Sequence, residues 1–132
     1  MEPRISLVTL GVADLKRATR FYEELLRLPR LETPPEVVFF ELGKTWLALY
    51  PRELLAADAG VPAEGYGFPR FTLAHNVSSE AEVDRLLDEV AALGGRIVRY
   101  GQRASWGGYT GYFADPDGFL WEVAWNPNFP HV

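Results

Sequence analysis

Apolar and polar residues recur along the first half of this chain in patterns that predict one helix and several strands. An apolar, β-branched run over residues 5–12 predicts a strand, and apolar positions at helical spacing over residues 15–26 predict a helix. Residues 37–42 and 45–50 predict a hairpin across Gly43 and Lys44, because a two-residue loop suits a primed turn. A short strand is also expected at residues 30–33.

The same order of elements is expected after residue 69. Residues 70–77 predict a strand, and Ser79 with Glu82 forms the capping box of a helix that ends at Gly94 and Gly95. In the first half, Asp14 is the expected N-cap and Pro29 the end of the helix. Three more strands are expected in the second half, at residues 97–100, 108–114 and 119–125.

The last two of these strands are joined by the turn Asp115-Pro116-Asp117-Gly118, which contains the residues that tight turns favour. Alternation along the final strand places Leu120, Glu122 and Ala124 on one face, and the residues between them on the other. A carboxylate in the middle of such a strand is unusual. Glu122 either faces solvent or points into an apolar cavity as a base or metal ligand.

Shifting the chain by 65 residues superimposes the two series, since Val12 falls on Val77 and Phe21 on Leu86. The pattern predicts an α+β fold of two βαβββ modules in tandem, residues 1–50 and 70–126, in one domain of 132 residues. The face of each sheet that its helix leaves uncovered is where a cavity is expected. Residues 51–69 form either a plain linker, with a possible helical turn at 53–57, or a lid or dimer arm.

Composition narrows the classes of function. The chain has no cysteine, a net charge of −5 and 13 basic residues that do not cluster, which argues against nucleic acid as a partner. It has neither an export signal nor an apolar run long enough to span a membrane, so a cytoplasmic location is expected. Aromatic residues make up 14% of the chain, and we expect some of them to line a ligand site.

Several stretches resemble a known family. The opening VTLGVADLKRATRFYEELL, the duplicated plan and the ending GYFADPDGFLWEV are similar to the vicinal oxygen chelate superfamily, which includes glyoxalase I, bleomycin-resistance proteins and extradiol dioxygenases. The resemblance implies paired βαβββ modules with curled mixed sheets enclosing a cavity, and usually a homodimer. It leaves open whether the modules pair within one chain or between two.

The resemblance also implies positions for metal ligands, on the first and last strands of each module. Those positions fall on Leu7, Ala48, Thr72 and Glu122. Only Glu122 is a strong donor, and divalent transition metals take three or four donors from a protein. We therefore expect no metal cofactor; a divalent metal held with the help of Glu122 is the alternative.

Parity then suggests which residues surround Glu122. Ala74, Leu120 and Ala124 are expected on its face, and candidates for binding a ligand carry a hydroxyl, an aromatic ring or a charge: Thr9, Trp46, Tyr50, Thr72, Trp106, Tyr109, Tyr112 and Glu122. Each aromatic residue has an equally simple explanation in sheet packing. Arg70, Arg96, Arg99 and Arg103 are explained as solvated strand ends, although one of them could hold an anionic ligand.

The two histidines need separate treatment. His75 stands three residues after Thr72, so alternation turns it to the opposite face, beneath the second helix, as a packing residue. A bulge between the two would instead bring His75 close to Glu122 as a catalytic partner. His131 lies in the terminal tail, where a dimer contact or disorder is expected.

Three functions follow from these features. The favoured one is binding of a small aromatic or cationic molecule in an aromatic-lined cavity, with Glu122 as counter-charge and without a complete metal site. The second is an enzyme similar to glyoxalase-type lyases, isomerases or dioxygenases, with Glu122 as base or metal ligand and His75 or Thr72 assisting. The third is a domain that serves mainly for dimerisation.

Overall fold

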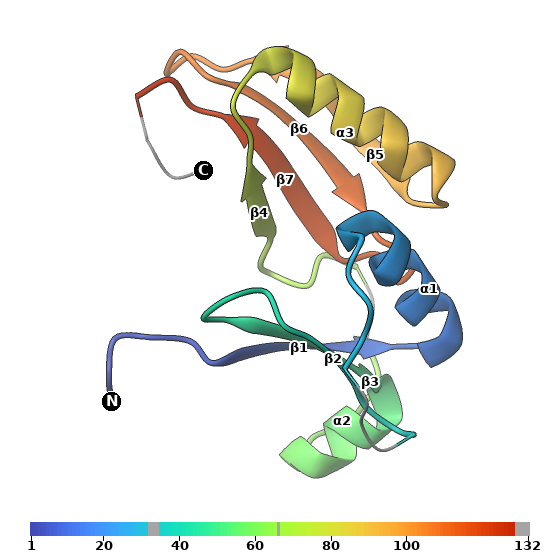
Figure 1. Cartoon of the computed structure of the whole chain (residues 1–132). Helices are drawn as coiled ribbons and strands as arrows, with labels where there is room; N and C mark the ends of the chain where they lie inside the picture. Colours follow the sequence, from blue (N-terminus) through green and yellow to red (C-terminus); the bar gives the residue numbers. More distant parts are fainter. Residues whose placement is uncertain (32–34, 66, 129–132) are drawn as a thin grey trace. The chain divides into compact units, whose positions relative to one another are not determined.

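The computed structural model describes residues 1–31, 35–65 and 67–128, and the chain divides into two compact units, residues 1–65 and 66–132. Each unit has one mixed sheet with helices packed on it (Figure 1). The predicted α+β class and the tandem arrangement of modules are confirmed. No helix within the described ranges is both long and apolar enough to cross a lipid bilayer.

The first unit has a sheet of three strands in the order β1-β3-β2. Strand β1 (Leu7–Val12) runs parallel to β3 (Trp46–Pro51), and β2 (Val38–Phe40) is antiparallel to β3. Helix α1 (Leu15–Leu26) follows β1, and its first turn is capped as predicted, because the Asp14 side chain accepts a hydrogen bond from the backbone N–H of Arg17. The helix ends where Arg27 adopts a left-handed conformation, two residues before Pro29.

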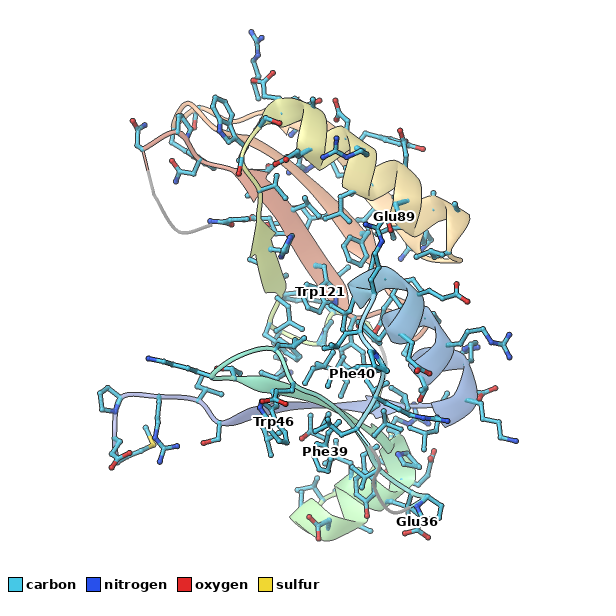
Figure 2. The ribbon with its side chains drawn as sticks, in the orientation of Figure 1. Glu36, Phe39, Phe40, Trp46, Glu89 and Trp121 are labelled. Carbon is cyan, nitrogen blue, oxygen red and sulfur yellow. The ribbon has the colours of Figure 1, made fainter. Side chains whose placement is uncertain are left out.

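The two faces of this sheet differ in burial. The face toward α1 includes the fully buried residues Leu10, Leu49 and Phe40, and the Phe40 ring lies 6.4 Å from that of Tyr22 on α1. Figure 2 shows Phe40 on one side of the sheet, with Phe39 and Trp46 on the other. Alternation within β2 and β3 therefore separates a buried core face from a second, aromatic face.

Helix α2 (Arg52–Ala59) lies on that second face, opposite α1 (Figure 1). It begins directly after β3 and packs closely on β1, since a Cβ added to Gly11 would meet Leu55 Cδ2 at 3.2 Å and Arg52 Cα at 3.3 Å. The sequence predicted only a helical turn at residues 53–57, so the structure extends the helical part of the 51–69 segment. The boundary between the two units falls within the same segment.

The second unit has a sheet of four strands in the order β4-β7-β6-β5, covered on one face by helix α3 (Figure 1). The elements are β4 (Leu73–Asn76), α3 (Glu80–Ala92), β5 (Arg96–Arg103), β6 (Tyr109–Ala114) and β7 (Leu120–Trp125). The capping box is present: Ser79 accepts from the N–H of Glu82, and the Glu82 carboxylate accepts from the N–H of Ser78. Leu87 and Val90 of α3 are buried against the sheet.

The turn between β6 and β7 is built around one buried carboxylate. Asp115 is 4% exposed, and its Oδ1 accepts hydrogen bonds of 2.9 Å from the N–H groups of both Asp117 and Phe119. The Phe119 carbonyl accepts in return from the Asp115 N–H, and Gly118 adopts φ 91°. This turn, predicted from the sequence, fixes the register of the two strands.

Several predicted boundaries need correction. The strand expected at residues 70–77 spans only Leu73–Asn76, where it pairs with β7; Arg70 adopts φ 70°, outside the extended region. The first strand likewise begins at Leu7 rather than residue 5, and β5 is longer than the predicted 97–100. Of the expected strand at residues 30–33, Arg30 and Leu31 are not in a strand, although Leu31 N–H donates to the Phe39 carbonyl; Glu32 and Thr33 lie outside the described residues.

Candidate functional site

Glu122 lies on the face of the second sheet opposite α3. The register pairs it with Ala74 on β4 and Tyr112 on β6, while the next residue, Val123, pairs with His75 and Gly111. A Cβ added to Gly111 would meet Leu87 Cδ1 at 2.5 Å, so this second row faces α3. The predicted division of the last strand into two faces is confirmed. Glu122 itself is half-buried.

The Glu122 carboxylate is held by a neighbouring tyrosine. The Tyr112 hydroxyl donates a hydrogen bond of 2.5 Å to Glu122 Oε2. This bond and burial raise the pKa of Tyr112, because both disfavour the phenolate. At neutral pH Tyr112 is therefore a fixed donor that orients Glu122.

Because of this hydrogen bond, we expect Tyr112 to lose its proton at a higher pH than an ordinary tyrosine. The pKa of Tyr112 in the folded protein is raised above the unfolded value of about 10. The hydrogen bond therefore stabilises the folded protein below about pH 10, and this stabilisation is lost as the pH rises through the folded-state pKa. Absorbance at 295 nm should show this midpoint as the difference between the wild type and Tyr112→Phe. In Glu122→Gln the midpoint should move back toward about 10; an unchanged midpoint would mean that the carboxylate is not the cause.

Arg99 contributes a positive charge to the same face. Its Nη1 donates to the Thr110 carbonyl at 2.9 Å and its Nη2 to the Thr110 hydroxyl at 2.6 Å. The guanidinium carbon lies 5.3 Å from the centre of the Tyr112 ring, within the range of a cation–π contact. Arg99, Thr110, Tyr112 and Glu122 thus form a continuous polar group, which we term the Glu122 cluster.

A bulge in β5 directs Arg99 to this face. Ile97 pairs with Phe113, but Arg99 pairs with Tyr112, so β5 uses two residues where β6 uses one. Without the extra residue Arg99 would lie opposite Gly111 and face α3. From the sequence, Arg99 was explained as a solvated strand end, because the alternation of residues 97–100 does not indicate a bulge. Thr110, a buried residue, was also missed.

The other predicted site residues of the second unit make no hydrogen bond to Glu122 within the described part of the chain. Tyr109 faces α3, where its hydroxyl donates to Asp84 at 2.8 Å, so the structure does not bring it together with Glu122. This bond raises the pKa of Tyr109. Trp106 lies in the connection between β5 and β6 and is 50% exposed. Thr72 precedes β4 and is exposed.

His75 is on the face opposite Glu122, as alternation predicted, since it pairs with Val123. The register of β4 with β7 is continuous from Leu73 to Asn76, so the bulge that would have turned His75 toward Glu122 is absent. Its side chain is exposed rather than packed under the helix, because β4 is an edge strand. His131 lies outside the described residues.

The candidates of the first unit share one face. Thr9, Trp46 and Tyr50 lie on the side of the first sheet opposite α1, together with Ala48, which pairs with both Thr9 and Phe39. The rings of Phe39 and Trp46 lie 6.3 Å apart on this side (Figure 2). Ala48 of the first sheet corresponds in position to Glu122 of the second. Ala48 is on β3, which lies between β1 and β2, and Glu122 is on β7, which lies between β4 and β6.

The positions implied for metal ligands do not fit a divalent transition metal. Leu7 and Ala48 have no donor atom in their side chains, and one oxygen of Glu122 is engaged by Tyr112. Over residues 1–31, 35–65 and 67–128, no group of three or more His, Asp or Glu side chains is placed to hold a metal ion. A carboxylate and a hydroxyl are too few donors to replace the hydration shell of such an ion.

Known proteins resemble this chain over nearly its whole length. A metallothiol transferase FosB from Lysinibacillus sphaericus is 26% identical over 118 residues, which cover 89% of this chain and 79% of that protein. The crystal structure of a glyoxalase-related enzyme from Fulvimarina pelagi is 36% identical with a TM-score of 0.87, covering 97% of this chain and 91% of the other. A lactoylglutathione lyase from Agrobacterium tumefaciens is 26% identical with a TM-score of 0.71, covering 96% and 98%.

The family assignment rests on a match that covers most of the chain. Residues 4–123 match the family described as Glyoxalase/Bleomycin resistance protein/Dioxygenase superfamily. Those residues include helices α1, α2 and α3, the Glu122 cluster and every strand of the two sheets except the last two residues of β7. The chain therefore belongs to the glyoxalase/bleomycin resistance protein/dioxygenase superfamily.

Proposed function

We propose that this protein binds a small organic molecule that presents a cationic, hydrogen-bond-donating group to Glu122. The observation that supports this proposal is that the Glu122 carboxylate has few partners. Glu122 is half-buried and accepts one hydrogen bond, from Tyr112, and no lysine, arginine or histidine in the described ranges forms an ion pair with it. A partly desolvated carboxylate with an oxygen to spare favours a cationic partner.

The surroundings of Glu122 favour an organic ligand over a simple ion. Tyr112 presents a ring beside the carboxylate, and Ala74 and Ala124 are small residues on the same face, so a flat group can lie close to the sheet. The lack of any donor atom at two of the four family metal positions, Leu7 and Ala48, supports binding without a metal. The family also includes bleomycin resistance proteins, and binding without catalysis would be in keeping with that name.

Binding of benzylammonium, an aromatic cation, tests this proposal. We expect wild-type amide resonances of β6 and β7 to shift on titration in ¹H–¹⁵N spectra, and Glu122→Gln to weaken the binding about tenfold or more, since a charge-assisted hydrogen bond contributes about 1.5–3 kcal/mol. Glu64→Gln, which removes the same charge from an exposed position of the first unit, is the matched control and should bind as the wild type does. Equal affinities of wild type and Glu122→Gln would refute the proposal.

A second candidate function is catalysis with Glu122 as a general base. It is favoured by the Tyr112 hydroxyl next to the carboxylate, which joins a proton donor and an acceptor at 2.5 Å, and by relatives whose names are those of enzymes. Because His75 faces away, Glu122 would act without it. If a metabolite screen detects turnover, Glu122→Gln should abolish it while His75→Ala leaves it unchanged; turnover that survives in Glu122→Gln would reject this candidate.

A further inference from the structure

We infer that Arg99 is a second ligand-binding residue and that it selects molecules carrying an oxyanion, a carboxylate or a phosphate, in addition to the cationic group. The inference rests on the proposed function, because the cationic group is the one held by Glu122. The ligand would accordingly be bipolar, with its two charged groups lying on either side of Tyr112.

The charge of Arg99 is not neutralised within the described part of the chain. Each acceptor that the guanidinium contacts is neutral: the Thr110 carbonyl, the Thr110 hydroxyl and, at 3.4 Å, the Tyr100 carbonyl. Arginine stays protonated at any physiological pH. A half-buried guanidinium with only neutral acceptors favours an anion, since its planar fork matches an oxyanion with two parallel hydrogen bonds.

Nearby acidic residues on the other face of the sheet already have partners. Asp84 of α3 accepts from Tyr109, and Glu80 lies 3.6 Å from Arg103. Arg103 therefore has an acidic partner on the helix side, whereas the bulge has turned Arg99 to the opposite face, where Glu122 is bonded to Tyr112. Arg99 and Arg103 differ in this respect although they are only four residues apart on β5.

Glu122 and Arg99 contact different parts of the Tyr112 side chain. Glu122 lies at the hydroxyl end of Tyr112, and the guanidinium of Arg99 lies over the ring of the same residue. A ligand that follows the Tyr112 side chain would therefore meet a negative group at one end and a positive group toward the other. A purely cationic ligand would be repelled by Arg99, and a purely anionic one by Glu122, whereas a bipolar ligand would be attracted by both.

The experiment compares matched probes by isothermal titration on the full chain. Benzylammonium carries the cation alone, benzoate carries the anion alone, and para-aminomethylbenzoate carries both on the same ring. We expect the bipolar compound to bind about tenfold or more tightly than benzylammonium, because it adds one charge-assisted contact. Beta-alanine and O-phosphoethanolamine form a second pair of probes. They share an aminoethyl group and differ mainly in the anion, so comparing them distinguishes a preference for carboxylate from one for phosphate.

Arg99→Gln should remove this preference and leave the affinity for benzylammonium equal or higher. Arg96→Gln, at an exposed position of the same strand, removes the same charge and should keep the preference. If Arg99→Gln does not fold, as judged by its amide spectrum, Arg99→Lys replaces it; Lys keeps the charge but not the fork, and the preference should fall at least about threefold.

The outcomes separate the two proposals. If benzylammonium binds through Glu122 but no bipolar compound binds more tightly, Arg99 is not a binding residue and the proposed function stands. If the preference persists in Arg99→Gln, the inference is likewise overturned. Absence of binding for every probe would overturn both proposals, and binding of the bipolar compounds alone, lost in Glu122→Gln and in Arg99→Gln, would support both.

Discussion

Replacing Phe40 by alanine should destabilise the protein by about 3–5 kcal/mol, the usual cost of removing a buried aromatic ring from a core. Phe40 is fully buried on the α1 side of the first sheet and packs against Tyr22. Alanine would leave a cavity that neither the sheet nor the helix can close without losing other contacts. Urea unfolding followed by circular dichroism should show a lower midpoint with an unchanged slope.

Phe39→Ala is the matched control, because it makes the same substitution at the neighbouring position. Phe39 is the preceding residue on the same strand, is only half-buried, and lies on the opposite face beside Trp46 (Figure 2). Phe39→Ala should therefore cost clearly less than Phe40→Ala. If the two variants lose equal stability, the assignment of the core face in the first unit is incorrect.

The second large effect is expected at Gly111, in the middle of β6. A methyl group there would stand 2.5 Å from Leu87 Cδ1, 3.0 Å from the Arg99 carbonyl and 3.2 Å from the Gly101 nitrogen. Two of these atoms belong to the backbone of β5 and cannot move without disturbing the pairing of the strands. Gly111→Ala should cost stability near the upper end of the range of about 1–3 kcal/mol typical of an overpacked core.

A double-mutant cycle with Leu87 tests the cause. In a Leu87→Ala background the nearest side-chain atom is gone, so Gly111→Ala should cost less, by about 0.5 kcal/mol or more, while the backbone contacts keep part of the penalty. Gly11→Ala is the matched control, because the atoms nearest its added methyl group stand at 3.2–3.3 Å. It should be milder; strictly additive losses at Gly111 and Leu87 would mean that the two residues do not compete for space.

Alternation and capping residues predicted much of the fold. Local sequence preferences were enough to predict three features: the faces of β7, the capping box at Ser79 and the turn at Asp115. The start of β4 was missed because it depends on where pairing with β7 begins, at Leu73 and Trp121, and that pairing is not readable from residues 70–77 alone. The length of β5 was missed because pairing with β6 extends it beyond its own apolar residues.

The candidate site was predictable to the extent that it depends on register. Glu122 and Tyr112 were both candidate ligand-binding residues on strands whose connecting turn was recognised, and the structure joins them by a hydrogen bond. Arg99 could not be placed, since its direction depends on a bulge set by the packing of two strands. Tyr109 was grouped with Glu122 although it faces Asp84, which shows that membership of a neighbouring strand does not fix a face.

The turn at Asp115 also limits how this protein tolerates changes in chain length. Strands β6 and β7 bring Tyr112 opposite Glu122 because the buried Asp115 carboxylate binds two amides at fixed positions. Inserting one residue there would shift the pairing and rotate every later side chain of β7 by half a turn, so Glu122 would enter the α3 interface and Val123 would take its place. Insertions and deletions in this loop should thus be far more harmful than most substitutions.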